Sequence, residues 1–194
     1  MKSEKLNVKD MINIGIFTTI LVVIKIVSGF LGVIPIVCII LPAITAIICG
    51  PVYALFLTKV NKFGMITILT GLLGLIYFLV GYGWPTFVVS VILGIIADFI
   101  TQKGDYCKKS YMVAGYCIHA LWPISTYILI WMMGDSYFAE LSKSMGSEYA
   151  EQFQSLLPWW SVFWIALLTL ITAVIGMGIG LKMIKKHFDR NEEI

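Results

Sequence analysis

Six long apolar runs dominate the sequence and restrict the folds open to it. They cover residues 11–32, 36–58, 65–80, 86–101, 111–133 and 159–182. An α-helix needs about 20 mostly apolar residues to cross the hydrocarbon core of a bilayer, because each residue rises only about 1.5 Å. The chain is 59% hydrophobic, whereas a soluble domain is about 45–50% apolar. We therefore expect an all-α integral membrane protein whose residues 1–194 form one domain, a compact bundle of six transmembrane helices.

The third and fourth runs are short for membrane spans, at roughly 16 residues each. The loop GYGWP at 81–85 joins them so closely that they must form an antiparallel pair. A single re-entrant hairpin is the alternative; it would change the number of spans but not the side of the termini. The first run follows a basic segment, as a signal peptide would, but it is too long and has no clear small-residue cleavage site. We interpret it as an uncleaved first helix.

Lysine and arginine residues are spread unevenly over the loops of this six-span arrangement. Twelve of the 14 lie on one face: Lys2, Lys5, Lys9, Lys59, Lys62, Lys103, Lys108, Lys109, Lys182, Lys185, Lys186 and Arg190. Cytoplasmic loops of membrane proteins are enriched in basic residues. The pattern predicts that both termini are cytoplasmic. It also predicts an outer loop at 134–158, whose middle is a candidate amphipathic surface helix.

The fifth run contains a polar stretch, GYCIHALWPISTY, in an otherwise apolar span. Polar groups that face lipid at this depth cost roughly 2–4 kcal/mol each, so they tend to face a cavity or another helix. His119, Trp122 and Thr126 are spaced i, i+3 and i+7, which places them on one face of a helix. This stripe is either the wall of a small-molecule site or a set of contacts between helices, and the spacing alone leaves both open.

Lys25 lies inside the first run, about 21 Å along the helix from Met11 and so in its outer half. A lysine there either extends its ammonium to the outer surface or meets an anionic or carbonyl-bearing ligand. Ser28 follows one turn later on the same face. Gly15 and Thr19 form a small-xxx-small pair lower on this helix, which lets either another helix of the bundle or a partner subunit approach closely.

Aromatic residues gather at the outer ends of the predicted spans. Tyr82 and Trp84 lie between the third and fourth runs, and Trp160 and Trp164 lie near the start of the sixth. With the polar groups above they could line one outer-leaflet pocket, although an interfacial aromatic belt also explains most of them. The predicted substrate-binding residues are Lys25, Ser28, Tyr82, Trp84, His119, Trp122, Thr126, Trp160 and Trp164. Asp98, near the inner end of the fourth run, is expected to pair with a cytoplasmic lysine.

The sequence carries no recognisable catalytic or cofactor motif. It contains no HExxH metal site, no GxSxG nucleophile elbow and no Walker A loop. His119 and His187 are too far apart in depth to share a metal ion, and the four cysteines have no CxxC spacing. The glycines at 176, 178 and 180 predict close helix packing rather than a dinucleotide loop. We expect no enzymatic activity, cofactor, metal or nucleic-acid partner, so uphill transport would draw its energy from a partner or an ion gradient.

Three segments carry a resemblance to a known family: LNVKDMINIGIFTTI at 6–20, GPVYALFLTKVNKFG at 50–64 and GIIADFITQKGDY at 94–106. With the chain length and the six spans, they make the chain similar to the substrate-binding S components of energy-coupling-factor (ECF) transporters. It resembles in particular the MptD-like members, once catalogued as Trep_Strep membrane proteins. The resemblance covers most of the chain and implies a multi-pass protein of a prokaryotic plasma membrane.

This resemblance implies a function and partners. S components bind a vitamin, a vitamin precursor or a similar small nutrient at the outer side, then dock on a transmembrane scaffold (T) subunit that carries two ATPase subunits. Small residues of the first helix mediate docking in the family, a place that Gly15 and Thr19 would occupy here. Ligand contacts come from the outer halves of helices four to six and from outer loops. We expect an S component; a stand-alone secondary carrier or permease is the alternative, and a membrane-embedded enzyme is a third hypothesis.

Overall fold

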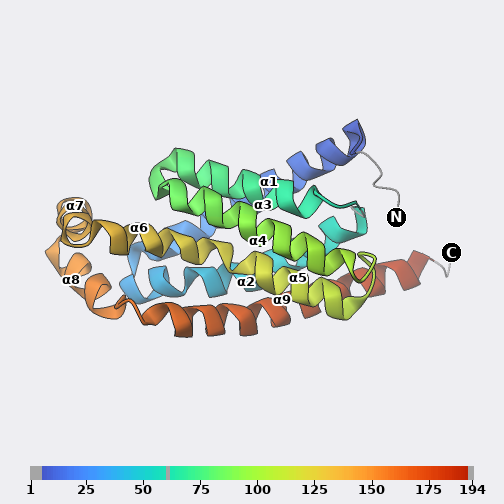
Figure 1. Ribbon diagram of the computed structural model, residues 1–194. Helices are drawn as coiled ribbons and strands as arrows, with labels where there is room; N and C mark the ends of the chain where they lie inside the picture. The colour runs from blue at the N-terminus through green and yellow to red at the C-terminus, as the bar shows by residue number, and fades with distance from the viewer. Residues whose placement is uncertain (1–5, 60–61, 192–194) are drawn as a thin grey trace.

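The structure, a computed structural model, describes residues 6–59 and 62–191, with side chains described as far as Lys185. All regular elements in these ranges are helical (Figure 1). The helices are α1 (Val8–Gly29), α2 (Pro35–Lys59), α3 (Met65–Tyr77), α4 (Trp84–Gln102), α5 (Lys109–Ala120), α6 (Thr126–Met133), α7 (Asp135–Met145), α8 (Ser147–Leu156) and α9 (Ser161–Asn191). Three short helical segments extend or link them: η1 (Phe30–Val33), η2 (Phe78–Tyr82) and η3 (Trp122–Ser125). The prediction of an all-α protein is confirmed.

Six helical stretches within the described residues are long and apolar enough to cross a membrane: Val8–Val33, Pro35–Lys59, Met65–Tyr82, Trp84–Gln102, Lys109–Met133 and Ser161–Lys185. They confirm the six predicted spans. The third and fourth are longer than predicted, because η2 extends α3 to Tyr82 and α4 already begins at Trp84. Gly81 and Gly83, with φ of 108° and 79°, reverse the chain here, in a conformation that residues with side chains rarely adopt. The predicted loop is therefore only a tight turn.

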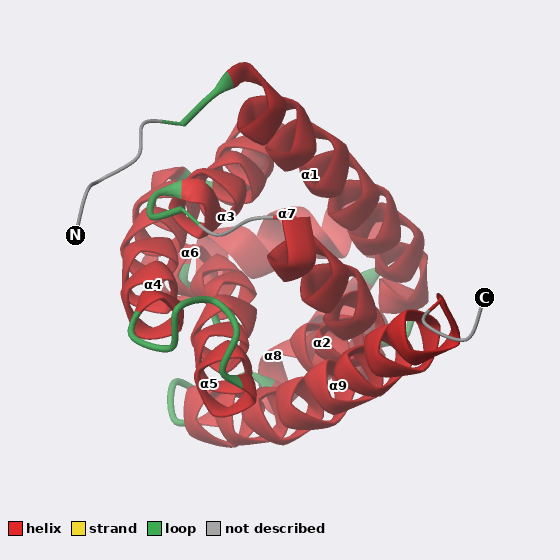
Figure 2. Ribbon diagram, turned by 90° about the vertical axis from the view of Figure 1, so that its right-hand side faces the viewer, coloured by secondary structure: helices red, strands yellow, loops and turns green. Residues whose placement is uncertain are grey.

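The long helices lie side by side in one bundle. Both ends of the chain lie at one end of this bundle, and α7 and α8 lie at the other (Figure 1). In the end-on view, α1 lies at the top of the bundle, α9 along the bottom and α4 at the left (Figure 2). Two clusters of buried side chains fill the interior, a larger one that includes Tyr53 and a smaller one that includes Tyr127.

Glycines let α2 and α9 touch backbone to backbone. Gly50 on α2 lies directly against Gly176 on α9, and a Cβ built on Gly180 would lie 2.7 Å from the nearest α2 backbone atom. A side chain at any of these positions would push the two helices apart. The packing role predicted for this glycine run is confirmed for Gly176 and Gly180, whereas Gly178 faces open space.

The fifth span is not the continuous helix that its sequence predicted. Helix α5 ends at Ala120, the 3₁₀ segment η3 follows, and α6 begins at Thr126. Pro123 lies in η3; a proline lacks the backbone N–H and its ring clashes with the preceding turn of an α-helix. His119, Trp122 and Thr126 therefore do not lie on one regular helical face, which corrects the expectation drawn from their spacing.

The segment predicted as an outer loop, residues 134–158, is mostly helical. Helices α7 and α8 meet at Gly146, whose φ of 91° turns the chain between them. Helix α7 buries no residue, whereas α8 buries Phe153 in the smaller core cluster. The Tyr149 hydroxyl donates to the carbonyl oxygen of Gly32 at 2.6 Å and ties α8 to η1. The helix expected in the middle of this segment is thus present as two helices, and the apolar and hydrogen-bonded anchors hold α8 against the bundle.

Asp98, fully buried on α4, caps the beginning of α3. Its Oδ2 accepts hydrogen bonds from the N–H of Gly64 (2.8 Å) and from the N–H and hydroxyl of Thr67 (3.1 and 3.0 Å), while Oδ1 accepts from the Tyr106 hydroxyl (2.7 Å). The free N–H groups at a helix N-terminus favour a carboxylate. Burial and the bond to this carboxylate raise the pKa of the Tyr106 phenol above its usual value, so the phenol stays a donor. The predicted lysine partner was wrong, since no ion pair among the described residues includes Asp98.

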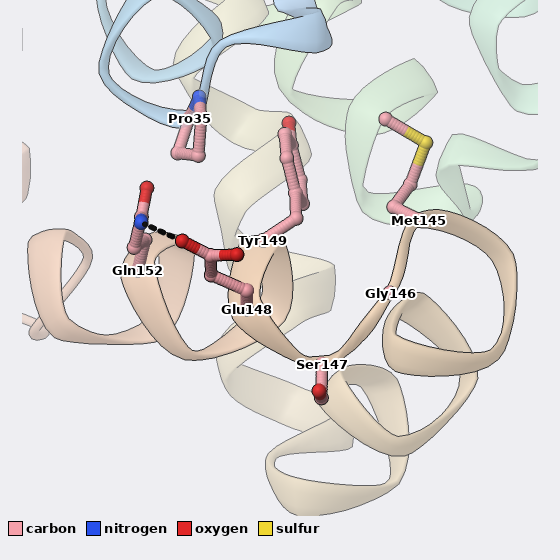
Figure 3. A pocket seen from close by; sticks show the side chains of 7 residues that line it. All are labelled: Pro35, Met145, Gly146, Ser147, Glu148, Tyr149 and Gln152. Atoms are coloured by element: carbon pink, nitrogen blue, oxygen red, sulfur yellow. Dashed lines mark hydrogen bonds between the residues drawn. The ribbon is translucent and has the colours of Figure 1, made fainter.

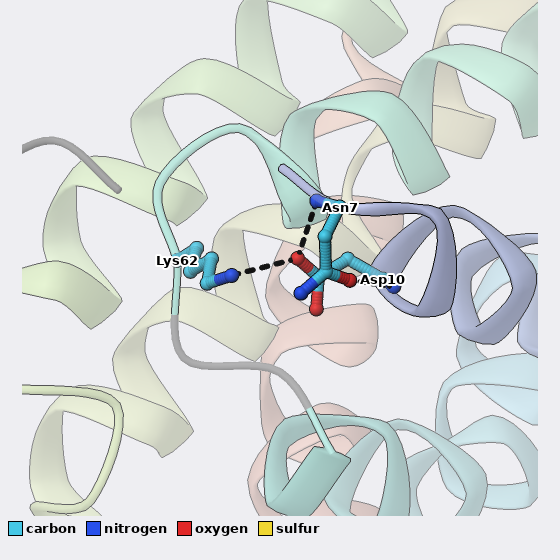
Figure 4. Close-up of polar contacts among 3 residues, drawn as sticks. All are labelled: Asn7, Asp10 and Lys62. Atoms are coloured by element: carbon cyan, nitrogen blue, oxygen red, sulfur yellow. Dashed lines mark hydrogen bonds and ion pairs between the residues drawn. The ribbon is translucent and has the colours of Figure 1, made fainter. Parts of the chain in front are cut away.

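Lys62 instead pairs with Asp10 near the end of the bundle that carries the chain termini, with Nζ 2.9 Å from Oδ2 (Figure 4). Asn7 and Asp10 also form a capping box at the start of α1, in which each backbone N–H donates to the other side chain at 2.9 Å. Such a box satisfies N–H groups that the first helical turn leaves free. The start of α1 is thus fixed to the segment before α3.

Candidate functional site

The site is built around Lys25, which α1 directs into the bundle. The residue is only 8% exposed, and its Nζ lies 4.9 Å from the centre of the Trp122 ring. The face of an indole attracts a cation held at this distance. Among the described residues no carboxylate lies within ion-pair distance of Lys25. The prediction that the ammonium extends to the outer surface was therefore wrong. The other prediction, that it meets an anionic or carbonyl-bearing ligand, remains.

Trp122, on η3, supplies the second polar group of the site. The residue has no exposed surface, and its indole Nε1–H has no hydrogen-bond partner in the described part of the chain. Tyr77 packs edge-on against the indole, with ring centroids 4.9 Å apart. A buried N–H without an acceptor costs about 1–3 kcal/mol. The site therefore holds an unused donor next to a cation that no described acid compensates.

His119, on α5, is fixed by its neighbours. Its Nδ1 lies 2.8 Å from the Thr70 hydroxyl, which donates its hydrogen to the carbonyl oxygen of Ile66 at 2.8 Å. Because a hydroxyl has only one hydrogen, Nδ1 is the donor to Thr70. The ring also packs against Tyr53 and Tyr116, with centroids 4.7 and 6.0 Å away. The Nδ1 side of His119 thus serves helix–helix contact, as one of the two predicted alternatives stated.

A line of aromatic rings connects the buried site with the surface. Tyr77 contacts Trp122 on one side and Tyr82 on the other, with centroids 4.9 Å apart in both pairs. Tyr82 is 46% exposed and ends the π-helical segment η2, next to the tight turn. The structure therefore brings Tyr82 into the same neighbourhood as Lys25 and Trp122, although not into contact with the lysine.

Ser28 and Thr126 contribute less than the sequence suggested. Ser28 is buried one turn after Lys25 on α1. Thr126 is half-buried, and its hydroxyl donates to the carbonyl oxygen of Pro123 at 2.8 Å, a bond that closes its own turn. Of the two, Ser28 is placed on the helix that bears the cation.

Three predicted binding residues lie apart from this site. Trp84 and Trp160 are 59% and 54% exposed, as expected for an interfacial aromatic belt. Trp164 is half-buried and packs on the smaller core cluster around Ile165, not on the cluster that holds Trp122. The aromatic residues therefore do not line one pocket as expected: Trp84, Trp160 and Trp164 lie apart from Lys25 and Trp122.

A cavity of about 440 Å³ lies at the end of the bundle opposite the termini, where Tyr149 points towards Pro35 (Figure 3). It is lined by Pro35, Met145, Gly146, Ser147, Glu148, Tyr149 and Gln152. None of the predicted binding residues lines it. Its polar side chains include a carboxylate and an amide on α8 that contact each other at 3.5 Å. Neither Lys25 nor Trp122 is among the lining residues, so this cavity is separate from the site around the buried cation.

One family model matches this chain. The model, described as a hypothetical bacterial integral membrane protein (Trep_Strep), covers residues 8–190. The chain belongs to the Trep_Strep family. The resemblance drawn from the sequence is confirmed at this level, and the Trep_Strep protein is a multi-pass membrane protein. No curated protein and no solved structure matches the chain.

Gly15 and Thr19 of the Trep_Strep protein lie on an open face of α1. Both are exposed, and a Cβ built on Gly15 would meet no atom within 4 Å. The Thr19 hydroxyl donates back to the carbonyl oxygen of Gly15 at 2.9 Å, so its polar group is satisfied within the helix. The alternative that this pair packs inside the bundle was wrong for the described residues, and the face is free for another molecule.

Sequence reasoning missed three residues around the site of the Trep_Strep protein. Tyr53 packs on His119 and its buried hydroxyl has no partner among the described residues. Tyr77 links the indole to the surface, and Thr70 orients His119. Each is a hydroxyl inside an apolar run, which is the signal that could have found it. Within the described chain, no three His, Cys, Asp or Glu side chains are grouped to hold a metal ion.

Proposed function

We propose that the protein is the substrate-binding S component of an ECF transporter, which captures a small nutrient at the outer face for ATP-driven uptake. The observation that carries this proposal is the buried Lys25 beside the unpartnered Trp122 Nε1–H. A lysine at the centre of a membrane helix costs about 2.5–3.5 kcal/mol, so such residues usually serve a function. The cost is offset when a ligand supplies the missing acceptor.

The depth of the site supports capture from the outside. Lys25 lies 17 residues after Val8, or about 26 Å along α1 from the end of the bundle that carries the termini. If the basic loops face the cytoplasm, as their distribution predicts, the lysine lies in the outer half of the membrane. Tyr82 and the turn after η2 then lie on the outer side as well, next to the entry of the proposed site.

The open face of α1 supports a partner subunit. The chain has no nucleotide-binding motif of its own, so an S component takes its energy from a scaffold subunit and two ATPases. Gly15 and Thr19 leave α1 smooth on one face, where the backbone of another helix can approach closely. Lys25 is buried while this face is exposed, so one helix serves binding and docking on different sides.

The decisive experiment is affinity purification from a native bacterial membrane, followed by mass spectrometry of the partners. We expect a scaffold subunit and two ATPases with the wild-type chain and with Gly178→Leu, because Gly178 also faces open space. Gly15→Leu should lose these partners while keeping its fold. Sustained uphill uptake by the purified protein alone in vesicles would contradict this function and favour a stand-alone carrier.

A further inference from the structure

We propose that the ligand of this site is a small organic molecule with one carboxylate, and that the carboxylate binds Lys25 Nζ and Trp122 Nε1–H. This inference rests on the proposed capture of a solute and adds the chemical class of that solute. It follows from three observations: the charge inside the bundle, the position of the two donors, and the absence of a second cation from the described interior.

The charge of Lys25 has no counterpart in the described protein. Asp98 already accepts four hydrogen bonds at the start of α3, and Asp10 pairs with Lys62. The remaining described acidic side chains are exposed: Asp105, Asp135, Glu140, Glu148 and Glu151. A buried charge is tolerated when it is paired. The negative charge that completes this site therefore comes from another molecule.

The two donors belong to neighbouring side chains inside the bundle. Lys25 Nζ lies 4.9 Å from the centre of the Trp122 ring, and the Nε1–H of the same ring is buried without an acceptor among the described residues. A carboxylate has two oxygens that accept several hydrogen bonds and no donor that would compete. One carboxylate group can therefore satisfy the ammonium and the indole N–H together. Hydrogen bonds of this charged kind are stronger than neutral ones.

The single cation favours a ligand with one negative charge. Of the described lysines, Lys25 is the buried one, and the half-buried Lys62 is held by Asp10. The Nδ1–H of His119 is engaged by Thr70. A phosphate monoester carries about 1.5–2 negative charges at neutral pH, which would leave excess charge buried. A cationic ligand would be repelled by the ammonium.

The apolar remainder of the ligand has aromatic neighbours. Trp122 and Tyr77 form an edge-on pair, and Tyr82 continues it to the surface. Rings of this kind provide large apolar contact area with few rotatable bonds. A flat or unsaturated carboxylic acid thus matches both parts of the site better than a sugar, whose many hydroxyl groups would find few described partners here.

The test uses pairs of probes that differ in charge but hardly in shape: benzoate with benzamide, and indole-3-acetate with indole-3-acetamide, plus phenyl phosphate. Binding to the full chain in detergent is measured by calorimetry for wild type, Lys25→Met and Lys143→Met. Lys143 is an exposed control on α7. We expect wild type and Lys143→Met to bind at least one acid tenfold or more tightly than its amide and than phenyl phosphate. Lys25→Met should lose that preference.

Equal binding of acid and amide, tighter binding of phenyl phosphate, retention of the preference by Lys25→Met, or no binding of either acid would each overturn the carboxylate proposal. The purification of partner subunits tests the transporter function independently of the ligand class. If scaffold and ATPases co-purify but amides bind as well as acids, the S-component function stands and the ligand class is wrong. If acids bind as expected but no partner is found, the ligand class stands and the transporter function falls.

Discussion

Lys25 and Trp122 meet inside the bundle, with the ammonium 4.9 Å from the centre of the indole ring. Helix α1 supplies the cation, and the 3₁₀ segment η3 supplies the ring at the point where Pro123 interrupts the fifth span. The ring attracts the cation but does not neutralise it. This unpaired charge destabilises the empty protein and provides binding energy for a ligand.

Lys25→Met should stabilise the empty protein and weaken ligand binding. Methionine keeps the length of the side chain and removes the charge, so we expect the free energy of unfolding in detergent to rise by about 1–3 kcal/mol, part of the cost of a lysine at membrane depth. Thermal unfolding with and without ligand measures both effects. A variant that is less stable than the wild type would show that the ammonium has a partner in the folded protein.

Trp122→Phe should separate the indole N–H from the aromatic ring. Phenylalanine keeps a ring for the Lys25 ammonium and for Tyr77 but has no donor. We expect affinity to fall by about 10- to 100-fold, because a hydrogen bond to a charged group contributes about 1.5–3 kcal/mol. Calorimetric titration checks this. Unchanged affinity would place the ligand away from Nε1. Trp122→Ala is less informative, because loss of the whole ring should lower the free energy of unfolding by about 3–5 kcal/mol.

Thr70→Val should loosen His119 without touching the cation. The substitution leaves the buried Nδ1–H of the imidazole without its acceptor, which costs about 1–3 kcal/mol of folding free energy. Thr126→Val is the matched control, because the Thr126 hydroxyl bonds only within its own turn. Thermal unfolding of the two variants side by side should show the larger loss for Thr70→Val, and equal losses would contradict the role given to this pair.

Asp98→Asn should destabilise the start of α3. The carboxylate accepts from two backbone N–H groups, the Thr67 hydroxyl and the Tyr106 phenol, and an amide replaces charged acceptors by one neutral acceptor and a donor. We expect a loss of about 2–3 kcal/mol. Asp105→Asn, on an exposed side chain nearby, should leave the free energy of unfolding unchanged. Hydrogen exchange at the amides of Gly64 and Thr67 locates the effect.

The sequence predicted the helical spans because membrane insertion depends on length and hydropathy, which each run carries by itself. It also predicted the packing of the glycines on α9, because small residues are what close helix contact needs. It did not predict the rotation of each helix. The runs are apolar on nearly all sides, so their pattern does not show that Tyr53 packs on His119 and Tyr77 on Trp122. Nor does it show that Trp84 and Trp160 point outwards.

Two further differences have local causes. Pro123 stops the helix within the fifth run, and its effect on the spacing of His119 and Thr126 depends on how the turn re-forms. Asp98 was expected to seek a lysine, but the N-terminus of α3 offers several N–H groups at once. The partner of a buried carboxylate is decided by which helices pack against it. The distribution of charges along the sequence does not show this packing.

The contact between Gly50 and Gly176 also limits how the bundle can move. Side chains at an ordinary helix interface change rotamer or slide, but two backbones in contact have nothing to rearrange. We therefore expect helices α2 and α9 to move together as one rigid pair. Helix α1 packs on this pair through side chains, with Phe17 of α1 against Phe56 of α2 at a ring-centroid distance of 5.4 Å. We therefore expect any rearrangement of the bundle to shift α1, the helix that carries the ammonium, relative to α2 and α9.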